Sequence, residues 1–449
     1  MFGGFTNVPR KSNEPGQKPL GVIQSPILTP QQQPLGVIAS PQTAPQGRPG
    51  PLGVVPSPGQ VVGPPGPSGD DLKASEVEAQ WTGVIHGWSG YAKANREIMK
   101  RASVFAKIRI ADSSPWDPAE PDPAIQALYK FHRNLQVSSR APHITFLPPQ
   151  RETQASAYKI IYTMMETERI HPQLIALMNE QYDQCWVPTK WNEGTFKRSG
   201  LTIPTHVMPL GVDPGIYTPS APPFVPRAML MTGKDAGRIE LPKGFLFISV
   251  FQPSFRKGYD VLIKTFEDTF RNDPEAGLIL GTTAYSLPHD EFPWKTMKSR
   301  IWALTGTYTE RQLASVYKAC KVYITTSRGE GWGLGMTEAA TVGLPVIVPR
   351  VSSFPELVPP GCGYFFDKDS DRVFPEGKAH SPWFDGIEFP DYGPKSQKQL
   401  SEIMKRVKKN YAEAQAMGQK LRAHMVSKFT WGMAARKVAD RIREICATR

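Results

Sequence analysis

The sequence has little cysteine and no long apolar run. Its 449 residues include four cysteines that stand far apart and form no C-x-x-C pair: Cys185, Cys320, Cys362 and Cys446. This spacing excludes a disulfide scaffold and argues against a structural zinc site. A membrane span needs about 18 or more consecutive apolar residues, and no such run occurs, so we predict no transmembrane segment. Because no charged stretch followed by an apolar one opens the chain, we also predict a cytoplasmic rather than a secreted protein.

Proline and positive charge, by contrast, are abundant. The chain has 45 prolines, and its 53 basic and 41 acidic residues give a formal net charge of +12. The basic run Lys405–Lys409 suggests a surface for nucleic acid or for an anionic membrane. It lies on an expected amphipathic helix that also carries Glu402, with Glu413 just beyond, and this mixture is typical of a solvated helix face. We therefore predict no specific nucleic-acid partner.

The first 70 residues form a separate segment. They contain 15 prolines and 12 glycines, a composition that cannot bury enough apolar surface to offset the entropy lost on ordering. We predict a disordered tail over residues 1–70. A short apolar motif recurs in it three times, at Pro19–Ile23, Pro34–Ile38 and Pro51–Val55, and a Ser-Pro pair follows each copy. Two interpretations remain open: a flexible linker, or a trivalent docking tail whose partner gains avidity from three copies.

The rest of the chain alternates short β-branched or aromatic runs with amphipathic segments, which is typical of an α/β fold with parallel sheets. Expected strands include Trp81–His86 in the first half and Phe245–Val250 in the second. A glycine-rich turn at Gly329–Gly335 opens an expected helix at Met336–Val342. We predict four parts: a first domain over 72–215, a proline-rich linker over 216–242, a second domain over 243–428, and a C-terminal helix over 429–449 that crosses back to the first domain.

The clearest chemical signal begins at Ser327. An expected strand ends there, and the alternate glycines Gly331, Gly333 and Gly335 precede the expected helix. Alternate glycines let the backbone approach a ligand closely, and a helix N-terminus attracts phosphate. Glu330 lies in the turn and Glu338 in the helix. Both carboxylates can then face one ligand and accept hydrogen bonds from sugar hydroxyls.

This stretch resembles a known family. Glu330 to Glu338, with Gly-Trp-Gly-Leu-Gly between them and Gly-Leu-Pro-Val-Ile afterwards, is similar to the E-x7-E signature of the retaining glycosyltransferases of family 4, a group that includes glycogen and sucrose synthases. Phe255–Asp260 resembles the family's basic diphosphate-binding segment. Further matches lie in the expected order, at Val187–Trp191, Pro209–Asp213 and Phe429–Trp431. The resemblance covers about residues 81–449 and is most specific from 244 to 350.

The resemblance implies a GT-B fold, with two Rossmann-like domains facing a cleft, and a donor site in the second domain. Arg256 and Lys257 are implied to stabilise the leaving diphosphate, and Glu330 to be catalytic. Many members carry another arginine after the first strand of this domain, where this chain has Val250–Gln252, so Arg256 and Lys257 carry more of the charge. The implied donor-binding residues are Glu338, Gly331, Gly333, Leu334, Gly335, Met336, Thr337 and Tyr308.

Two of these implied roles are specific. The backbone N–H groups of Met336 and Thr337 are expected to bind phosphate at the start of the helix. Tyr308, together with Thr307, is expected to line the pocket for the nucleotide base.

The first domain is implied to present the acceptor. Gly87–Gly90 loosely matches the Gly-Gly acceptor loop of the family. The acceptor-side candidates are His86, Gly87, Gly90 and Glu166. The acceptor itself stays open between a glycan, a lipid-linked molecule and a protein.

An aspartate-rich segment, with Asp367, Asp369 and Asp371, invites a metal interpretation. An EF-hand loop that starts at Asp367 needs glycine at its sixth position and glutamate at its twelfth, where this chain has Arg372 and Lys378. We predict no metal site and no cofactor, with a nucleotide-diphospho-sugar as the co-substrate.

The resemblance thus implies a retaining hexosyltransferase-type enzyme that moves a sugar from a nucleotide-diphospho-sugar to a hydroxyl acceptor. No nucleophilic carboxylate is assignable, so the expected route is front-face displacement, in which the leaving diphosphate helps to activate the acceptor hydroxyl. Two alternatives remain. One is another GT-B reaction, such as nucleotide-sugar epimerisation or phosphorolysis, and the other is a non-catalytic sugar-binding scaffold.

Overall fold

The computed structural model describes residues 77–87, 89–111, 122–152, 156, 158–283, 287, 291–306, 308–373 and 382–449. The chain divides into two units, residues 1–66 and 67–449, and every described residue belongs to the second. The predicted tail over residues 1–70, with its three repeats, lies outside the described residues.

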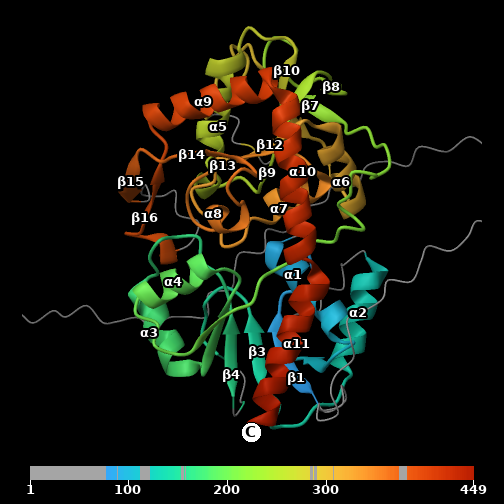
Figure 1. The fold of residues 1–449 in the computed structure, drawn as a ribbon, viewed down its shortest axis with the longest axis vertical. Coiled ribbons are helices and arrows are strands. Elements are labelled where there is room, and N and C mark those ends of the chain that lie inside the picture. The colour runs from blue at the N-terminus through green and yellow to red at the C-terminus, as the bar shows by residue number, and fades with distance from the viewer. Residues whose placement is uncertain are drawn as a thin grey trace, which may run out of the picture. The chain divides into compact units, whose positions relative to one another are not determined.

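The first domain is built on a six-stranded sheet whose neighbouring strands are all parallel, in the order β2-β1-β3-β4-β5-β6 (Figure 1). The strands are β1 (Glu78–Gly83), β2 (Lys107–Ile110), β3 (His143–Phe146), β4 (Lys159–Tyr162), β5 (Gln184–Val187) and β6 (Thr205–Val207). The helices are α1 (Gly90–Ala102), α2 (Pro123–Arg133), α3 (Pro172–Gln181) and α4 (Lys190–Arg198). All residues of β3 and β5 are buried, as in parallel sheets that are covered on both faces.

The second domain contains an eight-stranded sheet in the order β14-β13-β12-β9-β10-β11-β7-β8. Its strands are parallel except β7 and β8, which pair antiparallel at one edge. The strands are β7 (Ala228–Leu230), β8 (Ile239–Glu240), β9 (Phe245–Val250), β10 (Ala276–Thr283), β11 (Arg300–Leu304), β12 (Val322–Ile324), β13 (Val346–Pro349) and β14 (Tyr364–Phe366). The predicted α/β class is confirmed.

Helices and one hairpin surround this sheet (Figure 1). The helices are α5 (Tyr259–Phe270), α6 (Glu310–Ala319), α7 (Leu334–Val342), α8 (Phe354–Leu357), α9 (Pro394–Lys409) and α10 (Tyr411–Lys428), with short 3₁₀ turns at Phe255–Lys257 and Pro382–Phe384. The hairpin consists of β15 (Ser370–Val373) and β16 (Glu388–Asp391), which pair antiparallel.

The segment predicted as a linker, residues 216–242, also contributes to the second sheet. It holds β7 and β8, and the pairing of β7 with β11 places Leu230 opposite Trp302. The two strands have three and two residues. Strands this short show no alternating pattern among prolines, so the sequence did not reveal them.

The C-terminal segment joins the two domains a second time. Val212 N donates to Phe429 O (2.9 Å), and Trp431 N donates to Val212 O (3.3 Å). A Cβ on Gly211 would lie 2.4 Å from Trp431 N, so this close approach requires glycine. Helix α11 (Trp431–Ala447) then packs along α1 and β1 of the first domain, as Figure 1 shows.

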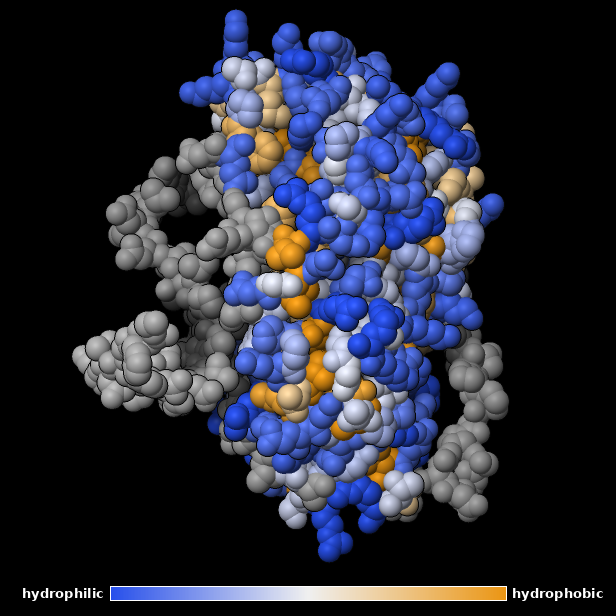
Figure 2. All heavy atoms as spheres, turned by 90° about the vertical axis from the view of Figure 1, so that its left-hand side faces the viewer, coloured by the Kyte–Doolittle hydropathy of each residue, from blue (hydrophilic) through white to orange (hydrophobic). Residues whose placement is uncertain are grey.

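Large apolar side chains are concentrated in the interior. One buried cluster runs through both domains and includes Trp81, Trp302 and Trp431. Another contains Leu174 of α3 together with Phe384 and Phe389, so the hairpin segment of the second domain packs on the first domain. The face drawn in Figure 2 is accordingly mostly hydrophilic, with hydrophobic residues in small groups. Among the described residues, no helix has both the length and the apolar character needed to cross a bilayer.

Candidate active site

The loop between β12 and α7 is the centre of the candidate site. It ends at Gly333, whose φ of 87° is in the left-handed region that glycine adopts readily. The N–H groups of Met336 and Thr337 both donate to Gly333 O at 3.1 Å. Both N–H groups therefore have a backbone acceptor in this structure, and their role toward a phosphate stays a prediction. The N–H groups that open the helix ahead of them belong to Leu334 and Gly335.

The predicted cation pair lies directly against this loop. Arg256 and Lys257 belong to the 3₁₀ turn that follows β9, and Gly258 closes this turn with a φ of 65°. Arg256 Nη1 donates to Gly329 O at 2.7 Å. Lys257 Nζ donates to Glu330 Oε1 at 2.5 Å. The three residues predicted as catalytic, Arg256, Lys257 and Glu330, thus come together in the structure.

Glu330 is held as a carboxylate by its neighbours. Ser327 Oγ donates to Glu330 Oε1 at 2.8 Å, and Arg256 Nη1 lies 3.8 Å from the same oxygen. Burial acts to raise the pKa of Glu330, but the charges of Lys257 and Arg256 outweigh it and lower that pKa below its ordinary value. An ionised carboxylate accepts hydrogen bonds only, which suits the hydroxyl groups of a sugar.

Arg328, which the sequence analysis did not single out, clamps the cation-bearing turn onto the loop. Its side chain is only 4% exposed. Arg328 Nη1 and Nη2 donate to the two carboxylate oxygens of Asp260 at 2.9 and 2.8 Å, and Nη1 also donates to Phe255 O at 2.5 Å. The Arg328 backbone N donates to Arg256 O at 2.7 Å. A bidentate pair of this kind fixes orientation as well as charge. The only sequence signal was an arginine beside the glycine-rich turn.

Glu338, the second acid of the motif, contacts a residue of the first domain. Lys93 Nζ of α1 donates to Glu338 Oε1 at 2.7 Å, and Tyr317 OH donates to Glu338 Oε2 at 3.3 Å. The Glu338 side chain is 7% exposed. Lys93 lies 245 positions away in the sequence, so no local pattern could have predicted this contact.

Several first-domain groups reach the glycine-rich loop. Glu166 Oε1 lies 3.5 Å from Arg256 Nη2, and a Cβ on Gly329 would lie 1.7 Å from Glu166 O. Asn192 Nδ2 donates to Gly331 O at 2.9 Å. Gly90 is adjacent to Leu334, whose Cδ1 would lie 3.3 Å from a Cβ on that glycine. The predicted acceptor-side residues Glu166 and Gly90 therefore lie at the loop.

The remaining predicted residues lie in other surroundings. His86 is buried, and its ring lies 5.3 Å from the Tyr129 ring of α2. Gly87, with a φ of 82°, has its carbonyl oxygen 2.8 Å from Arg96 Nη1. Tyr308 OH donates to Arg227 O at 3.0 Å. Thr307 lies outside the described residues. The roles of these residues toward a ligand stay predictions.

A further contact between the domains lies at the start of α4. The backbone N–H groups of Lys190 and Trp191, at the start of α4, donate to the two carboxylate oxygens of Glu356, each at 3.0 Å. Glu356 belongs to α8 of the second domain. A carboxylate at a helix N-terminus is favourable because it meets free N–H groups and the positive end of the helix dipole.

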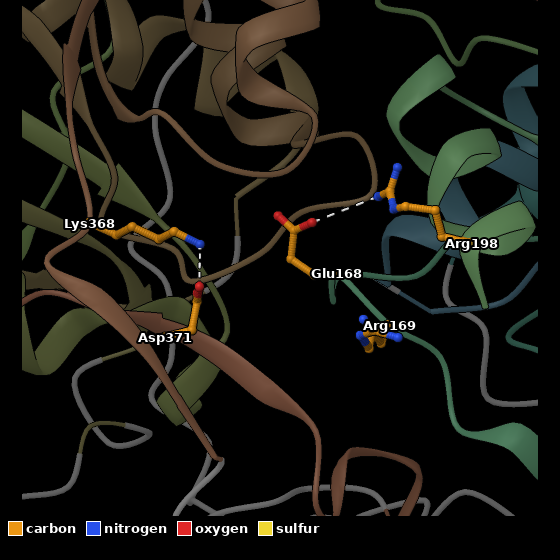
Figure 3. A pocket seen from close by; sticks show the side chains of 5 residues that line it. All are labelled: Glu168, Arg169, Arg198, Lys368 and Asp371. Carbon is orange, nitrogen blue, oxygen red and sulfur yellow. Dashed lines mark hydrogen bonds and ion pairs between the residues drawn. The ribbon is translucent and has the colours of Figure 1, made fainter.

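A cavity of about 460 Å³ lies where the first domain meets the hairpin of the second (Figure 3). Its lining is entirely charged: Glu168, Arg169, Arg198, Lys368 and Asp371. Glu168 pairs with Arg198 at 3.7 Å and Lys368 with Asp371 at 2.5 Å. None of the acceptor-side candidates is among these lining residues, although Glu168 is two positions after Glu166.

The aspartate-rich segment has protein partners. Both Asp369 carboxylate oxygens accept backbone hydrogen bonds at the start of α9, from Lys395 N at 3.1 Å and from Ser396 N at 2.7 Å. Asp367 accepts from Arg350 Nε at 2.9 Å. Among the described residues, no group of three or more His, Cys, Asp or Glu side chains is placed to hold a metal ion. The sequence prediction of metal-independent chemistry stays a prediction.

Comparisons with known proteins match parts of the chain to a family and most of it to solved structures. Residues 242–377 match the family model described as Glycosyl transferases group 1. The matched range contains Arg256, Lys257, Glu330 and Glu338. Most of the second domain is therefore similar to the group 1 glycosyltransferases.

Curated relatives match parts of the chain. Uncharacterized protein 356 of Sulfolobus islandicus rod-shaped virus 1 is 22% identical over 222 residues, which cover 48% of this chain and 58% of that protein. Serotype-specific mannosyltransferase WbdA of Escherichia coli is 27% identical over 27% of this chain and 15% of its own length. Mannosylfructose-phosphate synthase of Agrobacterium fabrum is 26% identical over 24% of this chain and 25% of its own length. The chain thus spans less than two thirds of each of these relatives.

Solved structures match over most of the chain. Sucrose-phosphate synthase from Thermosynechococcus elongatus has a TM-score of 0.57 at 14% identity and covers 83% of this chain and 100% of its own. Anabaena HepE in complex with UDP-glucose has a TM-score of 0.53 at 12% identity, with the same two coverages. At these identities the likeness shows the fold. The predicted GT-B fold of two Rossmann-like domains is confirmed.

Proposed function

We propose that this protein transfers a sugar from a nucleotide-diphospho-sugar to a hydroxyl acceptor with retention of anomeric configuration. The observation that carries the proposal is the contact of Arg256 and Lys257 with the loop at Glu330, just ahead of the N-terminus of α7. Cations, a helix N-terminus and buried carboxylates are the groups that a charged diphosphate linked to a sugar requires. The matched family domain encloses all of them.

The cation pair is suited to a leaving diphosphate. Cleavage of the bond between the sugar and the diphosphate leaves negative charge on the diphosphate, and nearby fixed cations lower the energy of that transition state. An ammonium has three N–H donors and a guanidinium five, so Lys257 and Arg256 keep donors beyond those bonded to Glu330 and Gly329. Arg256 Nε is buried and has no hydrogen-bond partner within the described part of the chain. A phosphate oxygen would satisfy that donor.

The two glutamates would hold the sugars of the donor. Glu330 is adjacent to the cations, so it would accept hydrogen bonds from the transferred sugar next to the diphosphate. Glu338 lies further along the chain, within α7, and would accept hydrogen bonds from other hydroxyls of the donor. The leaving diphosphate would take the proton of the acceptor hydroxyl on the face from which it departs, and this geometry gives retention.

The test is a panel of nucleotide-sugars with and without acceptors. Purified protein is incubated with UDP-glucose, GDP-mannose and ADP-glucose, each alone and with a mixture of monosaccharides and sugar phosphates, and released nucleotide is measured. Acceptor-dependent release supports transfer, and the anomeric configuration of the product, read by NMR, decides whether it is retained. An epimerised nucleotide-sugar identifies epimerisation. Binding without turnover of any donor identifies a sugar-binding scaffold and contradicts the proposal.

A further inference from the structure

Lys93 links the first domain to the second acid of the motif. Its ammonium lies 2.7 Å from Glu338 Oε1, 2.9 Å from Tyr217 OH and 3.1 Å from Glu310 Oε2. An ammonium has three N–H donors, so these three oxygens account for all of them. The Lys93 side chain is 12% exposed, and its Nζ lies 4.6 Å from the centre of the Tyr217 ring. The position of this side chain is therefore determined by contacts on every side.

The charges around Lys93 keep it a cation. Burial acts to lower the pKa of Lys93, but the carboxylates of Glu338 and Glu310 outweigh burial and raise it above the ordinary value. In return, Lys93 is the cation in direct contact with the buried Glu338 carboxylate. Removal of the cation from a buried ion pair leaves the charge of the carboxylate uncompensated.

The contact leaves part of Glu338 available. A carboxylate has about four lone-pair sites. Lys93 takes one site on Oε1 and Tyr317 OH takes one on Oε2. Burial raises the pKa of Tyr317 well above its ordinary value, and Glu338 adds to this effect, so the hydroxyl keeps the proton that it donates. These donors, together with Tyr217, whose hydroxyl also interacts with Glu338, orient the carboxylate, and its remaining capacity can accept from ligand hydroxyls.

We propose that Lys93 is a positioning residue of the donor site, which holds the Glu338 carboxylate in the orientation that accepts hydrogen bonds from the ribose hydroxyls of the donor nucleotide. The inference rests on the proposed function, since it requires a nucleotide-sugar donor. It adds to the donor site a residue from the first domain. Donor binding then depends on the contact between the two domains at α1 and α7, and the second domain by itself does not complete the site.

The experiment measures ribose recognition in the full chain. The dissociation constants of UDP, GDP and ADP are determined for the wild type by calorimetry, and the diphosphate that binds best is compared with its 2′,3′-dideoxy counterpart. We expect the wild type to prefer the ribose form by about tenfold or more, and Lys93→Met to lose most of this preference while its affinity for the dideoxy form changes less than about twofold. Arg101→Met is the matched control, because Arg101 is on the same helix and pairs with Asp213 at 2.7 Å.

A double variant separates positioning from a general structural role. Lys93→Met should cause no further loss of ribose preference when Glu338 is already glutamine. This double variant also avoids an unpaired buried carboxylate if the single variant folds poorly.

Each outcome decides a different point. If Lys93→Met keeps the ribose preference, or binds the diphosphate more tightly because Lys93 competes with it for Glu338, the positioning role is wrong and the proposed function stands. If the wild type binds a diphosphate without preferring ribose, the positioning role is also wrong and the proposed function still stands. If the wild type binds none of the three diphosphates, the proposed function fails, and this inference fails with it.

Discussion

Lys257 Nζ lies 2.5 Å from Glu330 Oε1, which joins the cation-bearing turn after β9 to the glycine-rich loop before α7. The two residues are 73 positions apart and come from adjacent strands of the second sheet, β9 and β12. Both side chains are largely buried. Because parallel strands present their carboxyl ends at one edge, the loops that follow neighbouring strands meet there, and a diphosphate and its sugar can be contacted together.

The two glutamates are expected to be required for transfer. We expect Glu330→Ala and Glu338→Ala each to lower kcat/KM by about tenfold or more, the scale of losing at least one charge-assisted hydrogen bond. Steady-state kinetics with the donor found in the panel measures this. Glu275→Ala is the control, because Glu275 is 81% exposed in the same domain. Near-wild-type kinetics in both glutamate variants, with the fold intact, would contradict the site assignment.

The ion pair of Glu330 predicts a specific pH dependence of stability. The pKa of Glu330 is lower in the folded protein than the ordinary value of a glutamate, which is about 4.3. The ion pair of Glu330 therefore stabilises the folded protein fully above about pH 4.3, and this contribution is lost as the pH falls through the folded-state pKa of Glu330. We expect Glu330→Gln to be less stable than the wild type by about 3 kcal/mol at pH 7, with a difference that shrinks toward pH 3. Denaturant unfolding at a series of pH values measures this, and a difference independent of pH would contradict it.

Arg328 is expected to act through the turn that it clamps. Lysine cannot form the two parallel hydrogen bonds that Arg328 makes to Asp260, so Arg328→Lys should misplace Arg256 and Lys257. We expect kcat/KM to fall by about tenfold and the free energy of unfolding by about 1–3 kcal/mol. Arg350→Lys is the control, since its pair with Asp367 is more than half exposed on both sides. If the two substitutions lowered kcat/KM and the free energy of unfolding equally, Arg328 would not hold the turn in place.

Transfer is expected to survive removal of divalent metal ions. The charge of the diphosphate would be met by Arg256, Lys257 and the N-terminus of α7. Activity should therefore stay within about twofold in excess EDTA, well under the tenfold change that corresponds to about 1.4 kcal/mol. Complete loss on chelation, restored by Mn²⁺ or Mg²⁺, would reverse this prediction.

The proline- and glycine-rich tail is expected to be dispensable for the chemistry. We expect a variant that starts at Asp71 to transfer sugar to a small acceptor within about twofold of the full chain, since the tail composition cannot form a core. Activity and thermal unfolding of both forms test this. A collapse of either would show that the tail supports the catalytic domains. Unchanged activity with lost association to a particulate partner would favour the docking interpretation of the three repeats over the linker.

Local patterns explain what the sequence alone could predict of the fold. The predicted strand at Phe245–Val250 coincides with β9, and the predicted helix at Met336–Val342 lies within α7. Helix α2, strand β11 and the hairpin of β15 and β16 were not predicted from the sequence, and β7 and β8 were predicted to be part of a linker. All residues of β15 are exposed, and β7 pairs antiparallel with both β11 and β8. Because β11 is distant in sequence from β7, no local pattern marks this pairing.

The sequence by itself determined the chemistry of the glycine-rich turn. Glu330, the alternate glycines and Glu338 lie within one loop and one helix, so their spacing is set by local backbone geometry. The tertiary structure alone decided which groups surround them. Lys93 reaches Glu338 from 245 positions away, and Arg328 reaches Asp260 from 68 positions away. Such contacts depend on the packing of two sheets and on the return of α11 to the first domain, and no local pattern encodes that packing.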